Sequence, residues 1–171
     1  MMETWVKAPF LEGASILIVG ECVESAFLKS LQNFTQNRVV LTSCPEREGF
    51  SGLTEKLAMI LRCSNPGEMT VLTVDGSPHC SMLHVSVTGA LFLTRAEIPI
   101  RHFVIVGEDE VKEVSPETIR VGRYLHLVEK CVQKYPEVVG DLKRLSLEQR
   151  SVKKGVSASS CRGRSFSHTR R

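Results

Sequence analysis

The stretch MTVLTVDGSPHC, residues 69–80, decides the fold class. Its first six residues are apolar or β-branched, which predicts a buried strand over 69–74. Asp75 ends that strand and Gly76 permits a tight turn. Ser77 followed by Pro78 predicts a helix start, because a hydroxyl at the N-cap and proline at the first helical position favour one. A buried strand leading directly into a helix is the repeating unit of a parallel α/β sheet.

The same unit recurs along the chain on both sides of this stretch. Apolar runs at 15–19, 38–42 and 101–106 predict strands, and 111–114 predicts a short partner strand after an acidic turn. Helical spacing predicts helices at 23–34, 53–62, 77–94 and 115–134. We therefore expect a three-layer Rossmann-like or flavodoxin-like α/β domain over residues 13–135, with a mainly parallel sheet of four to five strands.

The end of the chain differs in composition from this domain. Residues 136–150 hold a predicted short helix at 138–149, and residues 151–171 are rich in Ser, Gly, Lys and Arg, which predicts a disordered basic tail. Residues 143–171 carry a net charge of +8, whereas residues 1–142 carry −5. A solubilising tail, a frame-shifted end and weak binding to an acidic partner all remain open for this segment.

The amino-acid composition limits the classes of protein to which this chain can belong. The 171 residues are 42% hydrophobic, with no apolar run near the roughly 20 residues that a membrane span needs. The first thirteen residues lack a signal-peptide pattern, so we expect a cytoplasmic protein whose six cysteines are thiols or metal ligands. An aromatic content of 6% and the absence of a basic–aromatic face disfavour nucleic-acid binding by the domain.

Three cysteines follow the first three predicted strands: Cys22, Cys44 and Cys80. Ligands of parallel α/β sheets bind outside the carboxyl ends of the strands, so the topology brings these residues to one working face. Cys44 precedes Pro45 at a predicted N-cap, and Cys80 is the third residue of its predicted helix. The positive end of a helix dipole favours a thiolate at such positions.

Two histidines accompany Cys80. His79 shares its first helical turn, and His84 lies one turn beyond on the same face, where a Cys/His pair can bind a metal or form a thiolate–imidazolium pair. Asp75, Gly76 and Ser77 can position a ligand in this turn. A plainer interpretation has Asp75 and Ser77 satisfying turn amides, His84 on a partly exposed helix face, and the cysteines packing as small apolar residues.

Other residues are weaker candidates. The sequence after the first strand, Gly20 to Glu24, lacks the further glycines of a nicotinamide-dinucleotide fingerprint, and no Walker A sequence is present. His102 begins the fourth strand, away from the carboxyl-end face, which favours a packing or surface role. Cys63 and Cys131 are predicted core or satellite residues.

The placement of Cys22, of Cys44 before Pro45, and of the turn from Gly76 to Cys80 resembles the small iron–sulfur subunits of hydrogenases and related oxidoreductases, namely the methyl-viologen-reducing hydrogenase delta-subunit group. The resemblance covers residues 15–90. It implies a flavodoxin-like sheet with an iron–sulfur cluster on these loops, and an oxidoreductase or other protein subunit as partner. That family has more cysteines in the first and third loops, so a fourth ligand here would come from His79, His84, Asp75 or outside the chain.

Three functions follow as hypotheses. The first is a redox or metal-binding accessory domain in which Cys22, Cys44, Cys80 and His79 bind an iron–sulfur cluster or a single metal ion. The second is a cysteine-dependent enzyme with Cys80 as nucleophile and His84 or His79 as base. The third is a non-enzymatic ligand- or partner-binding domain in which the cysteines only pack.

Overall fold

The computed structural model describes residues 1–146, and within them five strands form one sheet in the order β2-β1-β3-β4-β5. The first four strands are parallel, and β5 pairs antiparallel with β4 at the edge. The strands are β1 (Ser15–Gly20), β2 (Val39–Ser43), β3 (Glu68–Val74), β4 (Ile100–Val106) and β5 (Glu110–Val114). The predicted α/β class with a mainly parallel sheet is confirmed.

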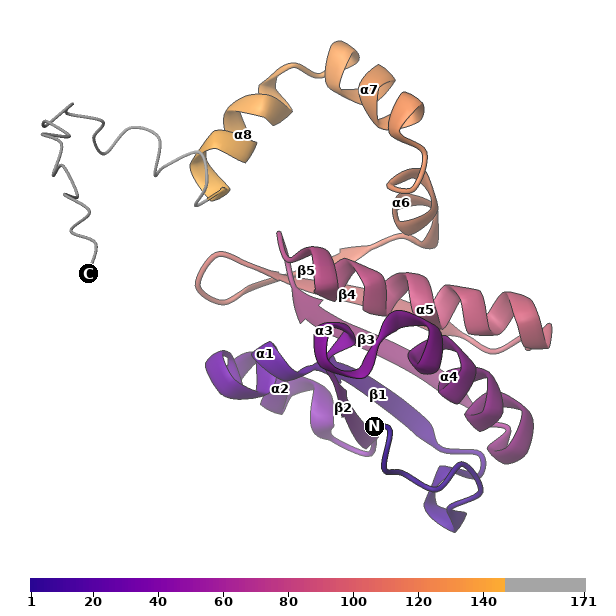
Figure 1. Cartoon of the computed structure of the whole chain (residues 1–171). Helices are drawn as coiled ribbons and strands as arrows, with labels where there is room; N and C mark the ends of the chain where they lie inside the picture. Colours follow the sequence, from indigo (N-terminus) through magenta and orange to yellow (C-terminus); the bar gives the residue numbers. More distant parts are fainter. Residues whose placement is uncertain (147–171) are drawn as a thin grey trace, which may run out of the picture.

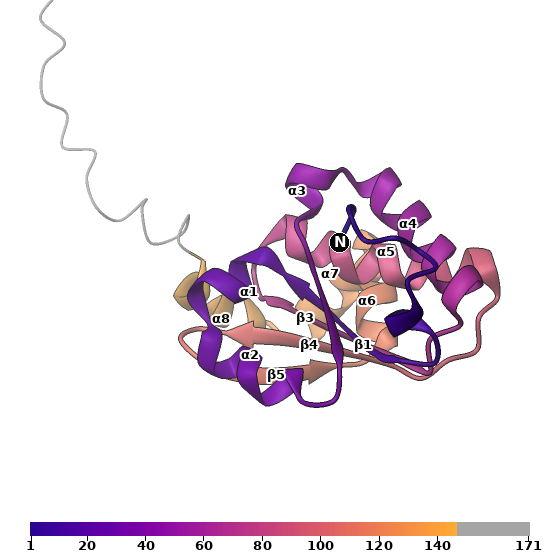
Figure 2. The same cartoon turned by 90° about the horizontal axis from the view of Figure 1, so that it is seen from below.

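Helices cover both faces of the sheet (Figures 1 and 2). The first are a 3-10 turn η1 (Pro9–Leu11), α1 (Glu21–Ala26), α2 (Leu28–Thr35), α3 (Pro45–Glu48), α4 (Phe50–Ser64) and α5 (Pro78–Thr94). They are followed by α6 (Pro116–Val121), α7 (Leu125–Lys134) and α8 (Glu137–Leu145). None of the helices in this described part is long and apolar enough to cross a membrane.

The apolar run of β1 is continuous because both of its faces are buried. Ile16 and Ile18 join the core beneath α4 and α5, whereas Leu17 and Val19 join the core beneath α1 and α2. Side chains alternate between the two faces of a strand, so a strand that is covered by helices on both faces needs apolar side chains at successive positions. The central place of β1 in the sheet thus explains its sequence.

Two predicted helices are each divided in the structure. The helix expected at 23–34 breaks at Phe27, whose φ of −131° and ψ of 46° are not helical. The helix expected at 115–134 breaks between Gly122 and Tyr124, where the Tyr124 amide donates to the Val121 carbonyl in a tight turn. After this second break, α7 and α8 leave the layered domain and contribute no buried residue.

Helices α6, α7 and α8 form an arc beside the β4–β5 edge of the sheet (Figure 1). Cys131, predicted to be a core or satellite residue, is exposed on α7, because α7 has no buried residue. The helix predicted at 138–149 corresponds to α8. The predicted basic tail at 151–171 lies outside the described residues.

One polar cluster is buried between the sheet and α5. The Nε2 atom of His84, on α5, lies 2.8 Å from the Thr73 hydroxyl on β3, and its Nδ1 lies 2.9 Å from Nδ1 of His102 on β4. The side chains of His84 and His102 are only 2% and 1% exposed. His84 therefore does not lie on the partly exposed helix face of the plainer interpretation. Of the packing and surface roles expected for His102, the structure shows packing.

Burial controls the ionisation of this histidine pair. It lowers the pKa of His84 to about 3, with the neighbouring His102 adding to the effect, and it lowers the pKa of His102 to about 4. Both rings are neutral in the folded protein at pH 7. The unfolded chain instead binds protons at both residues below a pH of about 6.5, so the contribution of the pair to stability is complete above that pH and declines as the pH falls.

We predict that the free energy of unfolding falls between pH 6.5 and pH 4 with a slope approaching about 2.7 kcal/mol per pH unit, the value for two protons. His102→Asn removes one of the two groups and should halve that slope between pH 6.5 and pH 5, where few carboxylates titrate. Urea unfolding measured at a series of pH values tests this. The matched control is His126→Asn on exposed α7, which should leave the slope unchanged. Equal slopes for the wild type and His102→Asn would contradict the prediction.

Candidate functional site

The carboxyl ends of β1, β2 and β3 lie level with one another. Gly20 at the end of β1 pairs with Ser43 at the end of β2, and Val19 pairs with Leu72 in β3. The chain then enters α1 from β1, α3 from β2 and α5 from β3, with α1 and α5 on opposite faces of the sheet. This is the switch point at which ligands of open α/β sheets bind. The prediction that the three loops share one edge is confirmed.

Cys80 lies beneath these loops rather than in the open. The Ser77 hydroxyl caps α5 by accepting from the Cys80 amide at 3.4 Å, as the Ser-Pro pattern predicted. The Cys80 side chain is 5% exposed, and its Sγ is 3.6 Å from the point where a Cβ on Gly20 would lie. The thiol is thus packed against the end of β1.

The other two thiols are more accessible. Cys22 is exposed on the first turn of α1, and Cys44 is half-buried at the N-cap of α3, where its side chain makes no capping hydrogen bond. Partial burial raises the pKa of the Cys22 thiol, and the negative charges of ionised Cys80, Cys44 and Glu21 add to that effect. Cys22 is therefore protonated at neutral pH, and the three thiols lie close enough to influence one another.

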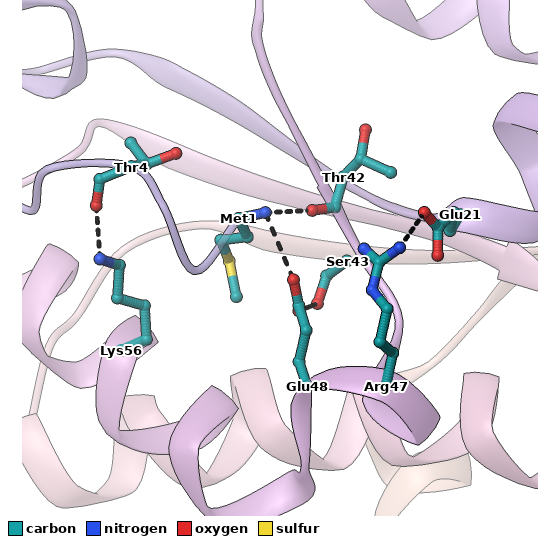
Figure 3. A network of polar contacts seen from close by, with 8 residues as sticks. All are labelled: Met1, Thr4, Glu21, Thr42, Ser43, Arg47, Glu48 and Lys56. Atoms are coloured by element: carbon teal, nitrogen blue, oxygen red, sulfur yellow. Dashed lines mark hydrogen bonds and ion pairs between the residues drawn. The ribbon is translucent and has the colours of Figure 1, made fainter.

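Two polar pairs join the loops. Arg47 on α3 donates to Glu21 on α1 at 2.7 Å (Figure 3), and His79 Nδ1 on α5 lies 3.3 Å from the Glu46 carboxylate on α3. All four side chains are substantially exposed, so solvent weakens both contacts. The two pairs thus connect the three loops through exposed contacts.

A second, less exposed set of polar contacts connects α3 to β2 and to the first residue of the sequence. The Glu48 carboxylate accepts from the Ser43 hydroxyl and lies 3.6 Å from the Met1 nitrogen, which also donates to the Thr42 carbonyl (Figure 3). The Lys56 ammonium binds the Thr4 carbonyl nearby. These contacts hold the first residues of the chain against β2 and α4.

The expected metal site of Cys22, Cys44, Cys80 and His79 is not preassembled. Across residues 1–146, no three His, Cys, Asp or Glu side chains are grouped so that they can hold a metal ion. The physical reason lies in where two of the side chains point: Cys80 packs on Gly20, and His79 pairs with Glu46. Ligation by all four residues would require these loops to rearrange.

The turn before α5 has the predicted backbone. Gly76 has a φ of 77°, in the left-handed region that favours glycine, and the Asp75 amide donates to the Ile105 carbonyl at 2.9 Å. Asp75 and Gly76 are exposed and Ser77 is half-buried. Their proposed part in binding a ligand stays a prediction.

His84 does not serve this edge of the sheet. Its two ring nitrogens are directed to Thr73 and His102, so neither is directed to Cys80. The predicted Cys80–His84 pair is therefore absent from the described structure, although the two residues are one helical turn apart. Their spacing placed them on one helix, but the side chains diverge toward different neighbours.

Sequence reasoning missed two groups of contacts. The Glu21–Arg47 and Glu46–His79 pairs join residues on different loops, and the only signal for them was opposite charge at successive predicted loop ends. The His84–His102 contact was missed because it depends on the position of α5 along β4. The alternation of side-chain direction along β4 predicts only that His102 and Val104 lie on the same face of the sheet.

Comparison with known proteins is consistent with this architecture. No curated protein and no solved structure matches the chain. The expected likeness to hydrogenase subunits is thus supported only at the level of the fold. A Rossmann-like domain family, by contrast, matches residues 8–162, which include the whole sheet and all three cysteine-bearing loops. The chain belongs to this Rossmann-like domain family.

Proposed function

We propose that this chain is a redox or metal-binding accessory domain that binds a soft metal ion or an iron–sulfur cluster through Cys22, Cys44 and Cys80. The observation that carries the proposal is the convergence of three cysteines on the three loops that meet at the switch point. Thiolates are the preferred ligands of zinc, copper(I) and iron–sulfur clusters. Three ligands from one chain leave a position for His79 or for a group supplied by a protein partner.

The contacts that hold His79 and the start of α5 in place are weak. His79 is held only by an exposed pair with Glu46, and the Ser77–Cys80 capping contact is long at 3.4 Å. A shift of the first turn of α5 would turn the Cys80 sulfur from Gly20 toward Cys22 and Cys44. The free energy of metal–thiolate bonding exceeds that of these contacts by a wide margin.

Metal uptake by cysteine variants tests this proposal. Protein purified without oxygen and reconstituted with iron and sulfide, or with zinc alone, should bind one cluster or one ion per chain. Cys22→Ser and Cys44→Ser should each weaken binding by about tenfold or more, because a thiolate ligand is lost. Iron, sulfide and zinc content, together with the absorption of sulfur-to-metal charge transfer, provide the readout.

The matched control is Cys131→Ser, which removes an exposed thiol on α7 far along the chain from the three loops. It should bind as much metal as the wild type. If the wild type takes up no metal, or if Cys131→Ser loses as much as Cys22→Ser, the proposal is wrong. The partner-binding hypothesis, in which the cysteines only pack, would then take its place.

The cysteine-dependent enzyme is a less favoured alternative, because the structure offers Cys80 neither exposure nor the His84 base. We predict that, among the thiols of Cys131, Cys22 and Cys80, Cys131 reacts with a maleimide first under native conditions, Cys22 more slowly because of its raised pKa, and Cys80 at least tenfold more slowly than either. Peptide mass spectrometry after timed labelling measures these rates. If Cys80 were labelled first, the enzyme hypothesis would be favoured instead.

A further inference from the structure

The outer sides of α4 and α5 are apolar. The two helices lie together on one face of the sheet (Figures 1 and 2). Between them runs a groove of about 500 Å³, and its walls include Phe50 and Met59 from α4 and Val85 and Leu93 from α5. Phe50, Met59 and Leu93 are exposed, and α5 carries apolar residues all round. A helix of that composition is typical of one covered on all sides, so this surface indicates an interface.

Two unpaired charges of opposite sign flank the apolar centre of this surface. Glu55 and Arg62 are exposed residues of α4 that line the groove, and neither side chain has an ion pair or hydrogen bond with any other part of residues 1–146. Two helical turns separate them, so they lie on one side of α4 but about 10 Å apart along its axis, too far to pair with each other. Ala58 and Met59 lie between them and also line the groove.

A second copy of α4 supplies the missing partner for both charges. When two copies of one helix pack antiparallel across a two-fold axis, residues equally far on either side of that axis face each other. With the axis between Ala58 and Met59, Glu55 of each copy faces Arg62 of the other. Ala58 of each copy then faces Met59 of the other. Two identical ion pairs thus form at once around an apolar centre, which is the arrangement of a self-complementary interface.

The charges also distinguish a second copy from the basic end of the same chain. Residues 143–171 carry a net charge of +8, and the groove has an excess of positive charge because it is lined by Arg62 and Arg123 but by Glu55 alone among acidic residues. Like charges repel, so this segment is a poor occupant of the groove. A second copy instead places each carboxylate against a guanidinium group.

We propose that two copies of this chain form a symmetric dimer in which their α4 helices pack antiparallel, with the two-fold axis between Ala58 and Met59. Met59 of each copy enters the groove of the other, where Ala58 and Gly89 are small enough to leave room for it. A contact centred on one helix pair lies at the small end of protein interfaces, so the dissociation constant is expected to be about micromolar or weaker. The dimer does not rest on metal binding by the cysteines.

Sedimentation equilibrium of the full chain, from about 1 μM to about 1 mM, tests the dimer. A reducing agent is included because Cys22 and Cys131 are exposed and can form intermolecular disulfides. The wild type should dimerise as its concentration rises. Glu55→Arg and Arg62→Glu should each raise the dissociation constant by about tenfold or more, because each places like charges together at two symmetric positions. Met59→Glu should do the same, because it puts a carboxylate into the apolar centre.

A mixture of the two charge variants tests the register of the helices. In a mixed dimer the two arginines of the Glu55→Arg chain face the two glutamates of the Arg62→Glu chain, so the mixture should form heterodimers about tenfold tighter than either variant's own dimer. The double variant Glu55→Arg/Arg62→Glu should regain the dimer for the same reason. Lys130→Glu, a charge change on exposed α7, is the matched control and should leave the dimer intact.

The three substituted positions on α4 are exposed in the single chain, so folding should be preserved, which circular dichroism and the melting temperature will verify. A wild type that stays monomeric at the highest concentration overturns the proposal. A dimer that tolerates Met59→Glu does so as well, since its interface must then lie elsewhere. Charge variants that weaken the dimer but do not recover on mixing overturn the antiparallel register.

Discussion

The parallel register of β1 between β2 and β3 is the constraint on which the rest of the molecule depends. It aligns Gly20 with Ser43 and Val19 with Leu72, so that three loops emerge at one edge. It also buries β1 on both faces, which requires a helical layer on each side of the sheet. The position of Cys22, Cys44 and Cys80 is a consequence of this register rather than of any sequence motif.

The edge built in this way combines a buried thiol with accessible ones. Cys80 packs against Gly20 at the start of α5, whereas Cys22 and Cys44 lie at short helices joined by the exposed Glu21–Arg47 and Glu46–His79 contacts. Below them, α5 is anchored to β3 and β4 through Thr73, His84 and His102. The loops at this edge are therefore joined by exposed polar contacts, whereas α5 beneath them is joined to the sheet by buried ones.

The sequence predicted the parts of this structure that depend on local chemistry. Strand positions followed from apolar runs, and the start of α5 followed from Ser77-Pro78, because capping acts within a few residues. Helix breaks at Phe27 and near Gly122 were missed, since the apolar spacing continues through both. Cys131 was predicted to be a core or satellite residue of an amphipathic helix, yet amphipathicity does not say which surface, if any, the helix packs against.

Contacts between elements that lie far apart in the sequence could not be predicted from local patterns. The His84–His102 hydrogen bond depends on how far α5 slides along β4, and the side-chain directions of His79 and Cys80 depend on the neighbouring loops. The sequence thus predicted that the three cysteine-bearing loops share one edge of the sheet, but not the directions of the side chains there. Within residues 1–146, the four expected metal ligands do not form a group that can hold a metal ion.

The most direct measurement of the central claim is X-ray absorption at the metal edge of the protein reconstituted with zinc or iron. The account predicts a coordination shell dominated by sulfur, with metal–sulfur distances near about 2.3 Å. It also predicts that Cys22→Ser loses sulfur from this shell while Cys131→Ser does not. A shell made of oxygen and nitrogen alone, or one that Cys22→Ser leaves unchanged, would contradict a thiol-based site at this edge.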